Sequence, residues 1–443
     1  MNTSSLSNQE VFQQAVQRGL IGGDIPLAGF INVDGIRRST SDLHEAFSRA
    51  PRILHSFAAK ANSLVPVLRL LREFGMGCEV ASAGELAVAL AAGFAPDRIV
   101  LDAPTKTRGE LSRALSLGVA TNLDNLQEVA RVSSMLADTP TESVLGVRVN
   151  PQVGGGSIAA MSTATTRSKF GVASRDAADR ELVIETFRAN PWLTRLHAHV
   201  GSQGCPLPLI AEGLASVYKL AKDINAAVGH DQVTSLDLGG GLPVNFDSDE
   251  VRPTFADYVA QLASTVPEIF DGEFSLVTEF GRSILAKNGF LASTVEYTKE
   301  AGDTRIALTH AGGQVATRTV FMPDAWPIRV TAHGPSGAEK TTDLRPHDIG
   351  GPLCFAGDLV ARDRVMPGLE PDDFVVLHDT GAYYFSCMWS YNVVPNPPVY
   401  GYCEDAQGQA RFVTIRPPQT LDEVVAANAG ALQTVLTEAF GHS

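Results

Sequence analysis

The feature that most constrains this chain is a series of short apolar segments that alternate with helical patterns over roughly 230 residues. Three of the helical stretches end at a glycine that can cap them, at Gly75, Gly93 and Gly118. An open, doubly wound sheet would show the same alternation, but a count of eight strands favours a closed (β/α)8 TIM barrel. The predicted strands are residues 53–60, 78–82, 99–103, 119–123, 144–150, 194–201, 235–239 and 275–281.

A different pattern after residue 283 predicts a second domain. Short β-like runs and frequent Pro and Gly replace the helical periodicity, and one helix is expected near residues 420–440. The strand-like segment 25–33 precedes the barrel and is expected to pair with the β-rich part. A chain of 443 residues also exceeds what one hydrophobic core normally supports. The sequence therefore predicts a barrel at 36–283 and a discontinuous, mainly β domain at 1–35 and 284–443.

Composition and charge predict a soluble, cytoplasmic enzyme. The formal net charge of −14 argues against a nucleic-acid partner. The five cysteines include no CxxC pair, which favours a reducing compartment over a zinc knuckle or a disulfide framework. The first residues show no secretory signal pattern, and no apolar run approaches the roughly 20 residues of a membrane span. No membrane partner is expected.

Lys60 ends the first predicted strand in an unusual setting, because the sequence FAAKAN surrounds it with apolar residues. An ammonium in apolar surroundings loses hydration, which lowers its pKa and makes the neutral amine available for imine chemistry. A lysine at a strand end can also extend its side chain to water, and the segment alone favours that interpretation.

Charged and small residues stand at the ends of later predicted strands, where barrels place their active sites. Arg148 lies on the fifth strand, and the Gly triplet 239–241 follows the seventh. The eighth strand ends in Glu279 and Arg282. Backbone amides of a Gly triplet can approach an oxyanion closely, and Arg282 can add a bidentate charge. The sequence therefore predicts a phosphate site at the last two strand ends.

An imine-forming lysine and a phosphate site together point to pyridoxal 5′-phosphate (PLP). Glu279 would keep the pyridine nitrogen protonated, which makes the ring a stronger electron sink. His199 would stack on the ring face, although a buried core histidine is an equally good interpretation of this residue alone.

The pair His197 and His199 offers a rival interpretation, because two histidines at i and i+2 also begin the zinc sites of barrel hydrolases. Such sites need further ligands at other strand ends. Of the other histidines, only His55 falls on a predicted barrel strand, and it lies far from the carboxyl end. A metal site is therefore not expected.

Taken in order along the chain, these motifs resemble the fold type III PLP-dependent decarboxylases, the group of diaminopimelate, ornithine and arginine decarboxylases. The resemblance covers nearly the whole chain and implies an alanine-racemase-like barrel followed by a β domain. The matching segments are FAAKAN, SAGELAVALAAGF, APTKTRGEL, SKFGV, HAHVGSQ, GGGLP, EFGR, GPLCFAGDLVARD and DTGAYYFSCMWSYN.

The resemblance implies roles for single residues. Lys60 would bind the cofactor as an imine, and Cys354 would be the acid that reprotonates the α-carbon. Cys354 and Tyr383 would reach the cofactor of the partner subunit, so the implied active unit is a homodimer with shared active sites. The implied cofactor contacts are Lys60, Arg148, His199, Ser202, Gly239, Gly240, Gly241, Glu279, Gly281, Arg282 and Tyr383.

Three positions that would read the substrate depart from the family pattern. Phe355 follows Cys354, where diaminopimelate decarboxylases carry Glu and ornithine decarboxylases Asp. Trp326 stands where a related motif has Arg, and His310 stands where Asp is expected. Asp358, on the same loop as Phe355, could still supply a carboxylate to a substrate amine.

The predicted function is a PLP-dependent decarboxylase of an amino acid or amino-acid conjugate other than diaminopimelate. A distal ammonium buried without an acidic partner would cost several kcal/mol. The alternative is a PLP-dependent amino-acid racemase, which shares this architecture. Glu279 favours the decarboxylase, because racemases of this fold tend to place Arg at the pyridine nitrogen. A metal-dependent barrel hydrolase is the least favoured reading.

Overall fold

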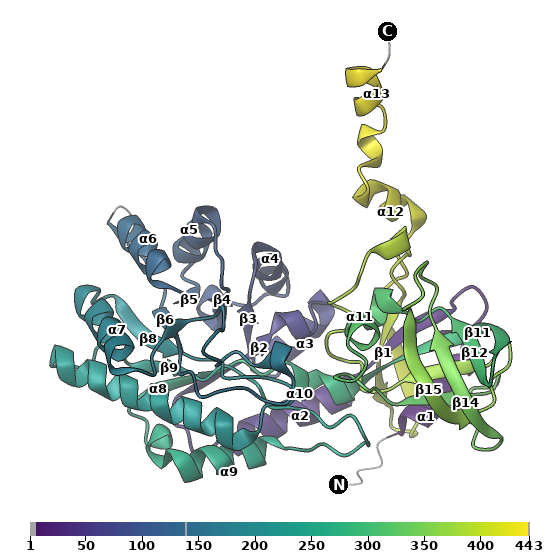
Figure 1. Ribbon diagram of the computed structural model, residues 1–443, viewed down its shortest axis with the longest axis horizontal. Coiled ribbons are helices and arrows are strands. Elements are labelled where there is room, and N and C mark those ends of the chain that lie inside the picture. Colours follow the sequence, from purple (N-terminus) through teal and green to yellow (C-terminus); the bar gives the residue numbers. More distant parts are fainter. Residues whose placement is uncertain (1–5, 138–139, 442–443) are drawn as a thin grey trace. The chain divides into compact units, whose positions relative to one another are not determined.

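The computed structural model describes residues 6–137 and 140–441 (Figure 1). Within them the chain forms two compact units, one made of Gly35–Asn288 and the other of Met1–Asp34 together with Gly289–Ser443. The first unit is a parallel barrel and the second is mainly β.

Eight parallel strands close the barrel, which confirms the predicted (β/α)8 fold. Their order around the barrel is β5-β4-β3-β2-β10-β9-β8-β6, and a pairing of β5 with β6 completes the circle. A two-residue strand, β7 (Val172–Ala173), extends β6 on its outer side. The barrel strands are β2 (Ile53–Ala58), β3 (Gly77–Val80), β4 (Ile99–Asp102), β5 (Ala120–Leu123), β6 (Leu145–Asn150), β8 (Leu193–His197), β9 (Ser235–Asp237) and β10 (Ser275–Thr278).

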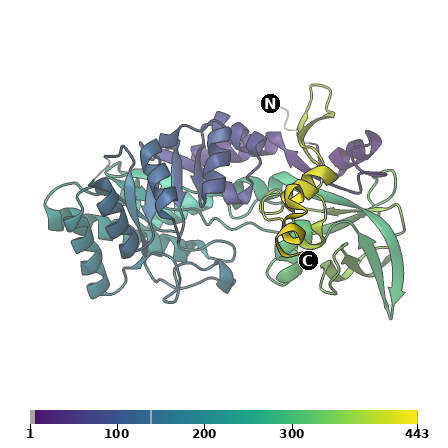
Figure 2. The same cartoon turned by 90° about the horizontal axis from the view of Figure 1, so that it is seen from above.

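Helices lie outside these strands (Figure 1, Figure 2). Several begin at a side chain that caps the first turn, such as Thr107 and Thr254, each of which accepts a hydrogen bond from the amide three residues later. The helices of this unit are α2 (Val33–Ala46), α3 (Val65–Glu73), α4 (Ala83–Ala91), α5 (Arg108–Leu117), α6 (Leu126–Leu136), α7 (Ala177–Ala189), α8 (Leu207–Val228), α9 (Phe255–Thr265) and α10 (Arg282–Leu285). Short 3-10 turns include η1 (Ala59–Ala61), which carries Lys60.

The second unit is built on one sheet with the order β15-β14-β12-β11-β1-β17-β18, to which β16 and β13 are added through β11. Strand β1 pairs antiparallel with β11 and parallel with β17, as expected for the N-terminal segment. The strands are β1 (Leu27–Asn32), β11 (Gly289–Ala301), β12 (Thr304–Thr309), β13 (Val330–His333), β14 (Leu344–Gly350), β15 (Leu359–Pro367), β16 (Phe374–Leu377), β17 (Val399–Glu404) and β18 (Ala410–Arg416).

The helices of the second unit differ from the prediction. The sequence analysis did not predict α1 (Asn8–Gln17) or α11 (Gly313–Phe321). The single helix expected at 420–440 is wrong, because the segment divides into α12 (Leu421–Ala427), a 3-10 turn and α13 (Val435–Phe440). Ala429 adopts a left-handed conformation with φ of 60°, which ends the first helix.

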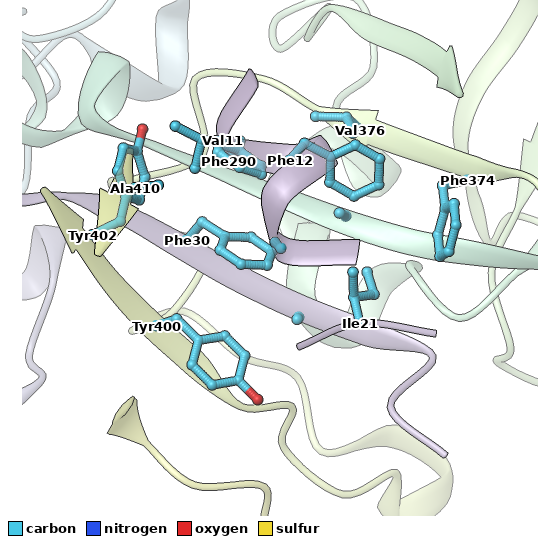
Figure 3. Close-up of a cluster of buried hydrophobic side chains, with 13 residues drawn as sticks. Val11, Phe12, Ile21, Phe30, Phe290, Phe374, Val376, Tyr400, Tyr402 and Ala410 are labelled. Atoms are coloured by element: carbon cyan, nitrogen blue, oxygen red, sulfur yellow. The ribbon is translucent and has the colours of Figure 1, made fainter. Parts of the chain in front are cut away.

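An aromatic core holds the β unit together (Figure 3). Phe30 on β1 stacks on Phe290 of β11 with ring centroids 4.8 Å apart, and both side chains are fully buried. Phe12 on α1 meets Phe374 of β16 edge to face at 5.4 Å. The helix that the sequence analysis missed is therefore part of this core.

None of the described helices has the length and apolar character needed to cross a membrane.

Replacing Phe30 by Ala should lower the free energy of unfolding of the β unit by about 3–5 kcal/mol, because a cavity replaces a stacked ring. Val413→Ala on β18 is the matched control, since that side chain is 61% exposed and its loss should cost less than about 0.5 kcal/mol. Urea unfolding followed by the fluorescence of Trp326 and Trp389, both in this unit, measures the difference. Equal losses for the two variants would contradict the assignment of this core.

Candidate active site

Chemically active side chains gather at the carboxyl ends of the barrel strands. This is the end of the barrel where the sequence analysis placed the site. The residues concerned follow or end β2 (Lys60), β3 (Glu79), β4 (Asp102), β6 (Arg148), β8 (His197, His199), β9 (Asp237 and Gly239, Gly240, Gly241) and β10 (Glu279, Gly281, Arg282).

Lys60 is paired with a buried carboxylate. Its Nζ lies 2.7 Å and 2.9 Å from the two carboxylate oxygens of Glu79. Burial raises the pKa of Glu79 to about 7, and the Lys60 ammonium opposes this rise. The side chain is 44% exposed and faces an acid, in line with the favoured interpretation of the segment, a lysine that extends toward water. Lys60 also lies on η1, beyond the end of β2 at Ala58.

His199 lies just beyond the end of β8, and a backbone hydrogen bond fixes its ring. The amide of Gly240 donates to His199 Nδ1 at 3.1 Å, so this nitrogen carries no proton. Burial, helped by the Arg148 guanidinium, lowers the pKa of His199 to about 3. A neutral, held imidazole suits a residue that stacks on a ring.

The Gly triplet is required by close backbone packing. Gly239 and Gly241 have φ of 63° and 103°, values that other residues rarely adopt. A Cβ on Gly240 would collide with the carbonyl oxygen of Glu279, and one on Gly241 would collide with that of Gly201. The backbone thus approaches closely enough for its amides to face an oxyanion.

The other predicted phosphate residues lie nearby along the chain. Arg282 is 6% exposed and begins α10. Gly281 precedes it, and a Cβ there would lie 2.9 Å from the Cβ of Ala61, beside Lys60. Ser202 is partly exposed and its amide donates to the carbonyl of Met161.

A chain of buried charges lies between the strands. Asp102 Oδ2 is 2.8 Å from Arg148 Nη1 and 3.2 Å from His197 Nε2. His197 Nδ1 is 3.3 Å from Asp237 Oδ1, and the side-chain amide of Asn122 donates to the other oxygen of Asp237 at 2.9 Å. Each cation is thus placed beside a carboxylate.

These ion pairs determine which protonation states of Asp102 and His197 are favoured. Burial alone would lower the pKa of His197, but Asp237 and Asp102 hold it well above the usual value. Burial alone would likewise raise the pKa of Asp102, but Arg148 and His197 hold it below its usual range. The two carboxylates beside His197 therefore favour its doubly protonated form.

Glu279 has a buried oxygen that lacks a partner. It is 4% exposed, and no described residue makes a hydrogen bond to its Oε1. Burial, and next the charge of Asp237, raise the pKa of Glu279 well above its usual value. A protonated ring nitrogen placed here would supply the missing donor, so the residues present fit a pyridine ring.

A metal centre is a poorer interpretation of the same residues. Asp102, His197 and Glu279 each place one ligand atom within 4.8 Å of the others, the single such group in the described part of the chain. However, Asp102 is already paired with Arg148, and a protonated His197 has no lone pair to offer a metal.

Two of the predicted residues belong to the β unit. Cys354 is exposed and its amide donates to Asn392 Oδ1 at 2.8 Å. Tyr383 has φ of 69° and lies under the Arg318 guanidinium, 4.0 Å from its ring centroid.

The predicted substrate residues have different surroundings. Phe355 belongs to an exposed aromatic cluster with Phe321, Trp389 and Tyr391, and it stacks on Phe321 at 5.7 Å. This cluster contains no acid.

Asp358 and Trp326 are buried and have contacts within the β unit, and their place at the substrate stays a prediction. The Asp358 carboxylate accepts hydrogen bonds from the amides of Gly313, at 2.6 Å, and Leu353, at 2.7 Å. It is 4% exposed, and these two bonds hold the loop. Trp326 is 2% exposed and lies under Arg318.

Sequence reasoning missed Asp102, Asp237 and the partnership of Glu79 with Lys60. The available signal was a carboxylate inside an apolar strand, in IVLD and SLD, since such a group must find a partner when buried.

Comparison with known proteins identifies the family. Residues 33–286 match the model described as "Pyridoxal-dependent decarboxylase, pyridoxal binding domain". The chain is 34% identical to a diaminopimelate decarboxylase of Pseudomonas fluorescens over 76% of this chain and 78% of that protein. It is 30% identical to one from Helicobacter pylori over 82% and 86%.

Solved structures agree with this assignment. The structure of Helicobacter pylori diaminopimelate decarboxylase complexed with L-lysine has a TM-score of 0.79 and 26% identity, and the match covers 92% of this chain and 97% of that one. A lysine/ornithine decarboxylase from Vibrio vulnificus shares the fold with a TM-score of 0.72. The chain belongs to the pyridoxal-dependent decarboxylases and is a PLP-dependent carboxy-lyase acting on an amino acid.

Proposed function

We propose that this chain decarboxylates an amino acid or amino-acid conjugate whose distal group differs from that of diaminopimelate, and that it works as a homodimer with shared active sites. The observation that carries the proposal is the contrast between two sets of residues. The charged cofactor residues of the barrel form a paired set, whereas the loop after Cys354 presents Phe355 within an aromatic cluster.

PLP, when bound, supplies the electron sink for the electron pair left by departing CO2. In this proposal Lys60 binds it covalently, and Glu79 holds the ammonium whenever the amine is released, since the two are 2.7 Å apart. Gly239–Gly241 and Arg282 would hold the phosphate. His199, neutral and fixed by the Gly240 amide, would stack on the ring. Cys354 would be the acid that supplies the proton to the product.

Glu279 supports a decarboxylase over a racemase. A carboxylate at the ring nitrogen favours a protonated, strongly electron-withdrawing ring, which suits the loss of CO2. The Glu279 oxygen that lacks a donor among the described residues supports such a role.

The proposal about the substrate rests on the lack of a free carboxylate on the loop after Cys354. Phe355 packs against Phe321 and Trp389, and Asp358, the acid three residues after Phe355, accepts hydrogen bonds from two backbone amides. A distal ammonium would find no free carboxylate on this loop, and leaving it unpaired would cost several kcal/mol. An uncharged, aromatic or larger conjugated distal group would instead gain apolar contact.

Lys60→Ala should abolish both decarboxylation and the visible cofactor absorption that borohydride removes, because the covalent linkage needs the amine. Lys222→Ala is the matched control, since Lys222 is exposed to a similar extent and also pairs with an acid, Glu273, but lies on helix α8 instead of following a barrel strand. Release of CO2 from a panel of amino acids, with spectra before and after reduction, measures both effects. Full turnover by Lys60→Ala would refute the assigned role.

Mixing Lys60→Ala chains with Cys354→Ala chains should restore part of the activity if the sites are shared. Each mixed dimer would then hold one intact site and one doubly damaged site. The control mixes Lys60→Ala with the double variant Lys60→Ala, Cys354→Ala, which can form no intact site. No recovery despite proven subunit exchange would count against shared sites.

Diaminopimelate, lysine and ornithine should be poor substrates, because their distal ammonium lacks a partner. Steady-state kinetics decide this, and a kcat/KM above about 10⁴ M⁻¹s⁻¹ for any of them would contradict the proposal.

One variant tests directly whether the missing carboxylate causes the weak activity on these substrates. Phe355→Glu should raise kcat/KM for lysine or diaminopimelate at least about tenfold, because it returns a carboxylate to the loop. Tyr297→Glu is the matched control, since it places an acid at a 63% exposed aromatic position of the same unit. An equal response to both acids would assign the gain to overall charge.

A further inference from the structure

We propose that His197 is a positioning residue whose positive charge favours the carboxylate form of Glu279, and so tunes the charge that meets the cofactor ring. The inference rests on the proposed role of Glu279 at the ring nitrogen. The proposed role of Glu279 does not itself require a second charged group, so the contribution of His197 is additional to it.

The first step is the clamp on His197. Its ring is fully buried, with Nε2 3.2 Å from Asp102 Oδ2 and Nδ1 3.3 Å from Asp237 Oδ1. A carboxylate on each side of the ring stabilises the doubly protonated form. Burial works against this charge, but the two acids hold the pKa of His197 well above its usual value.

The second step is the closeness of His197 to Glu279, because each places a ligand atom within 4.8 Å of the other. Neither His197 Nε2 nor Glu279 Oε1 has a hydrogen-bond partner among the described residues, and Nε2 lies at ion-pair distance from Asp102. An imidazolium and a carboxylate at this separation attract each other without a direct hydrogen bond, so Glu279 Oε1 stays available to the ring nitrogen.

The protonation of His197 depends on all the charged groups that face it. Asp102 on β4 and Asp237 on β9 are its carboxylate partners, and Arg148 on β6 shares Asp102. Glu279 follows β10. On its own strand and just beyond it, His197 has Arg195, whose charge is opposed by burial, and the neutral His199.

In this balance the imidazolium acts on Glu279 from inside the barrel. Burial and Asp237 push Glu279 toward its neutral form, and the His197 cation opposes them. Without that cation, a smaller fraction of Glu279 would be ionised at neutral pH. The ring nitrogen would then meet a neutral acid instead of a carboxylate.

His197→Gln removes the charge while leaving the neighbours partnered. Asp102 keeps Arg148, and Asp237 keeps the Asn122 side chain and the Gly239 amide. His55→Gln is the matched control, because His55 is also a buried histidine on a barrel strand but contacts the Thr278 hydroxyl, with no carboxylate beside it.

The first measurement is the pH profile of kcat/KM for whichever amino acid releases CO2. The acidic limb should move to higher pH by about one unit or more in His197→Gln, since an opposite charge at this distance typically lowers a carboxyl pKa by 1–3 units. His55→Gln should leave the limb in place. In a Glu279→Gln background the further change His197→Gln should not move the limb. A lower kcat with an unmoved limb would show a merely structural role and overturn the proposal.

The second measurement needs no turnover and no cofactor. For a group whose folded pKa is raised, stabilisation is complete below the unfolded value, near 6.5 for His, and is lost as the pH rises through the folded pKa. The stability gap between the cofactor-free full chain and its His197→Gln variant should therefore be largest below about pH 6.5 and shrink in alkali. A gap that does not change with pH would overturn the charge on His197.

The two measurements also separate this inference from the proposed function. If the pH-dependent gap appears but no amino acid is decarboxylated, the proposed function fails and the charged His197 stands. If decarboxylation is observed but the limb does not move in His197→Gln, the inference fails and the function stands.

Discussion

A carboxylate inside a barrel is tolerated only when a cation or several donors face it, and Asp102 meets this condition with Arg148 from β6 and His197 from β8. The pairing joins three strands that are far apart in sequence. It fixes the directions of two cations at the carboxyl end of the barrel. The remaining site is built against it, since His197 also reaches Asp237 and lies near Glu279.

Close backbone packing also holds the strand ends of the site together. The turn after β9 brings Gly240 against the carbonyl of Glu279, so the ends of β9 and β10 are held together without an intervening side chain. The same residue donates its amide to His199. Gly240 thus contacts the segments that follow β8 and β10 while itself following β9. This close packing explains why no residue with a Cβ is accommodated there.

Much of the fold could be predicted from the sequence, because eight alternating apolar segments at this length leave few architectures, and the barrel is confirmed. Strand ends were less accurate, so Lys60 was expected on a strand and lies on a 3-10 turn. Helices α1 and α11 were missed, since the apolar face of α1 is explained only by the β-unit core. The roles of the predicted cofactor residues remain proposals. The partnership of Glu79 with Lys60 could not be predicted, because it depends on two strands lying side by side.

The two parts of the chemistry face different physical constraints. In the barrel, Asp102 is paired with Arg148 and His197, so a substitution that removes both of its cations leaves a buried carboxylate unpaired and costs several kcal/mol. On the loop after Cys354, Phe355 lies in a partly exposed aromatic cluster. Replacing a side chain there leaves no buried charge without a partner. Substrate preference can therefore diverge on this loop while the cofactor residues stay fixed. Any difference in substrate preference from the diaminopimelate decarboxylases, to which the chain is about one-third identical, would therefore reside on this loop and not in the paired charges of the barrel.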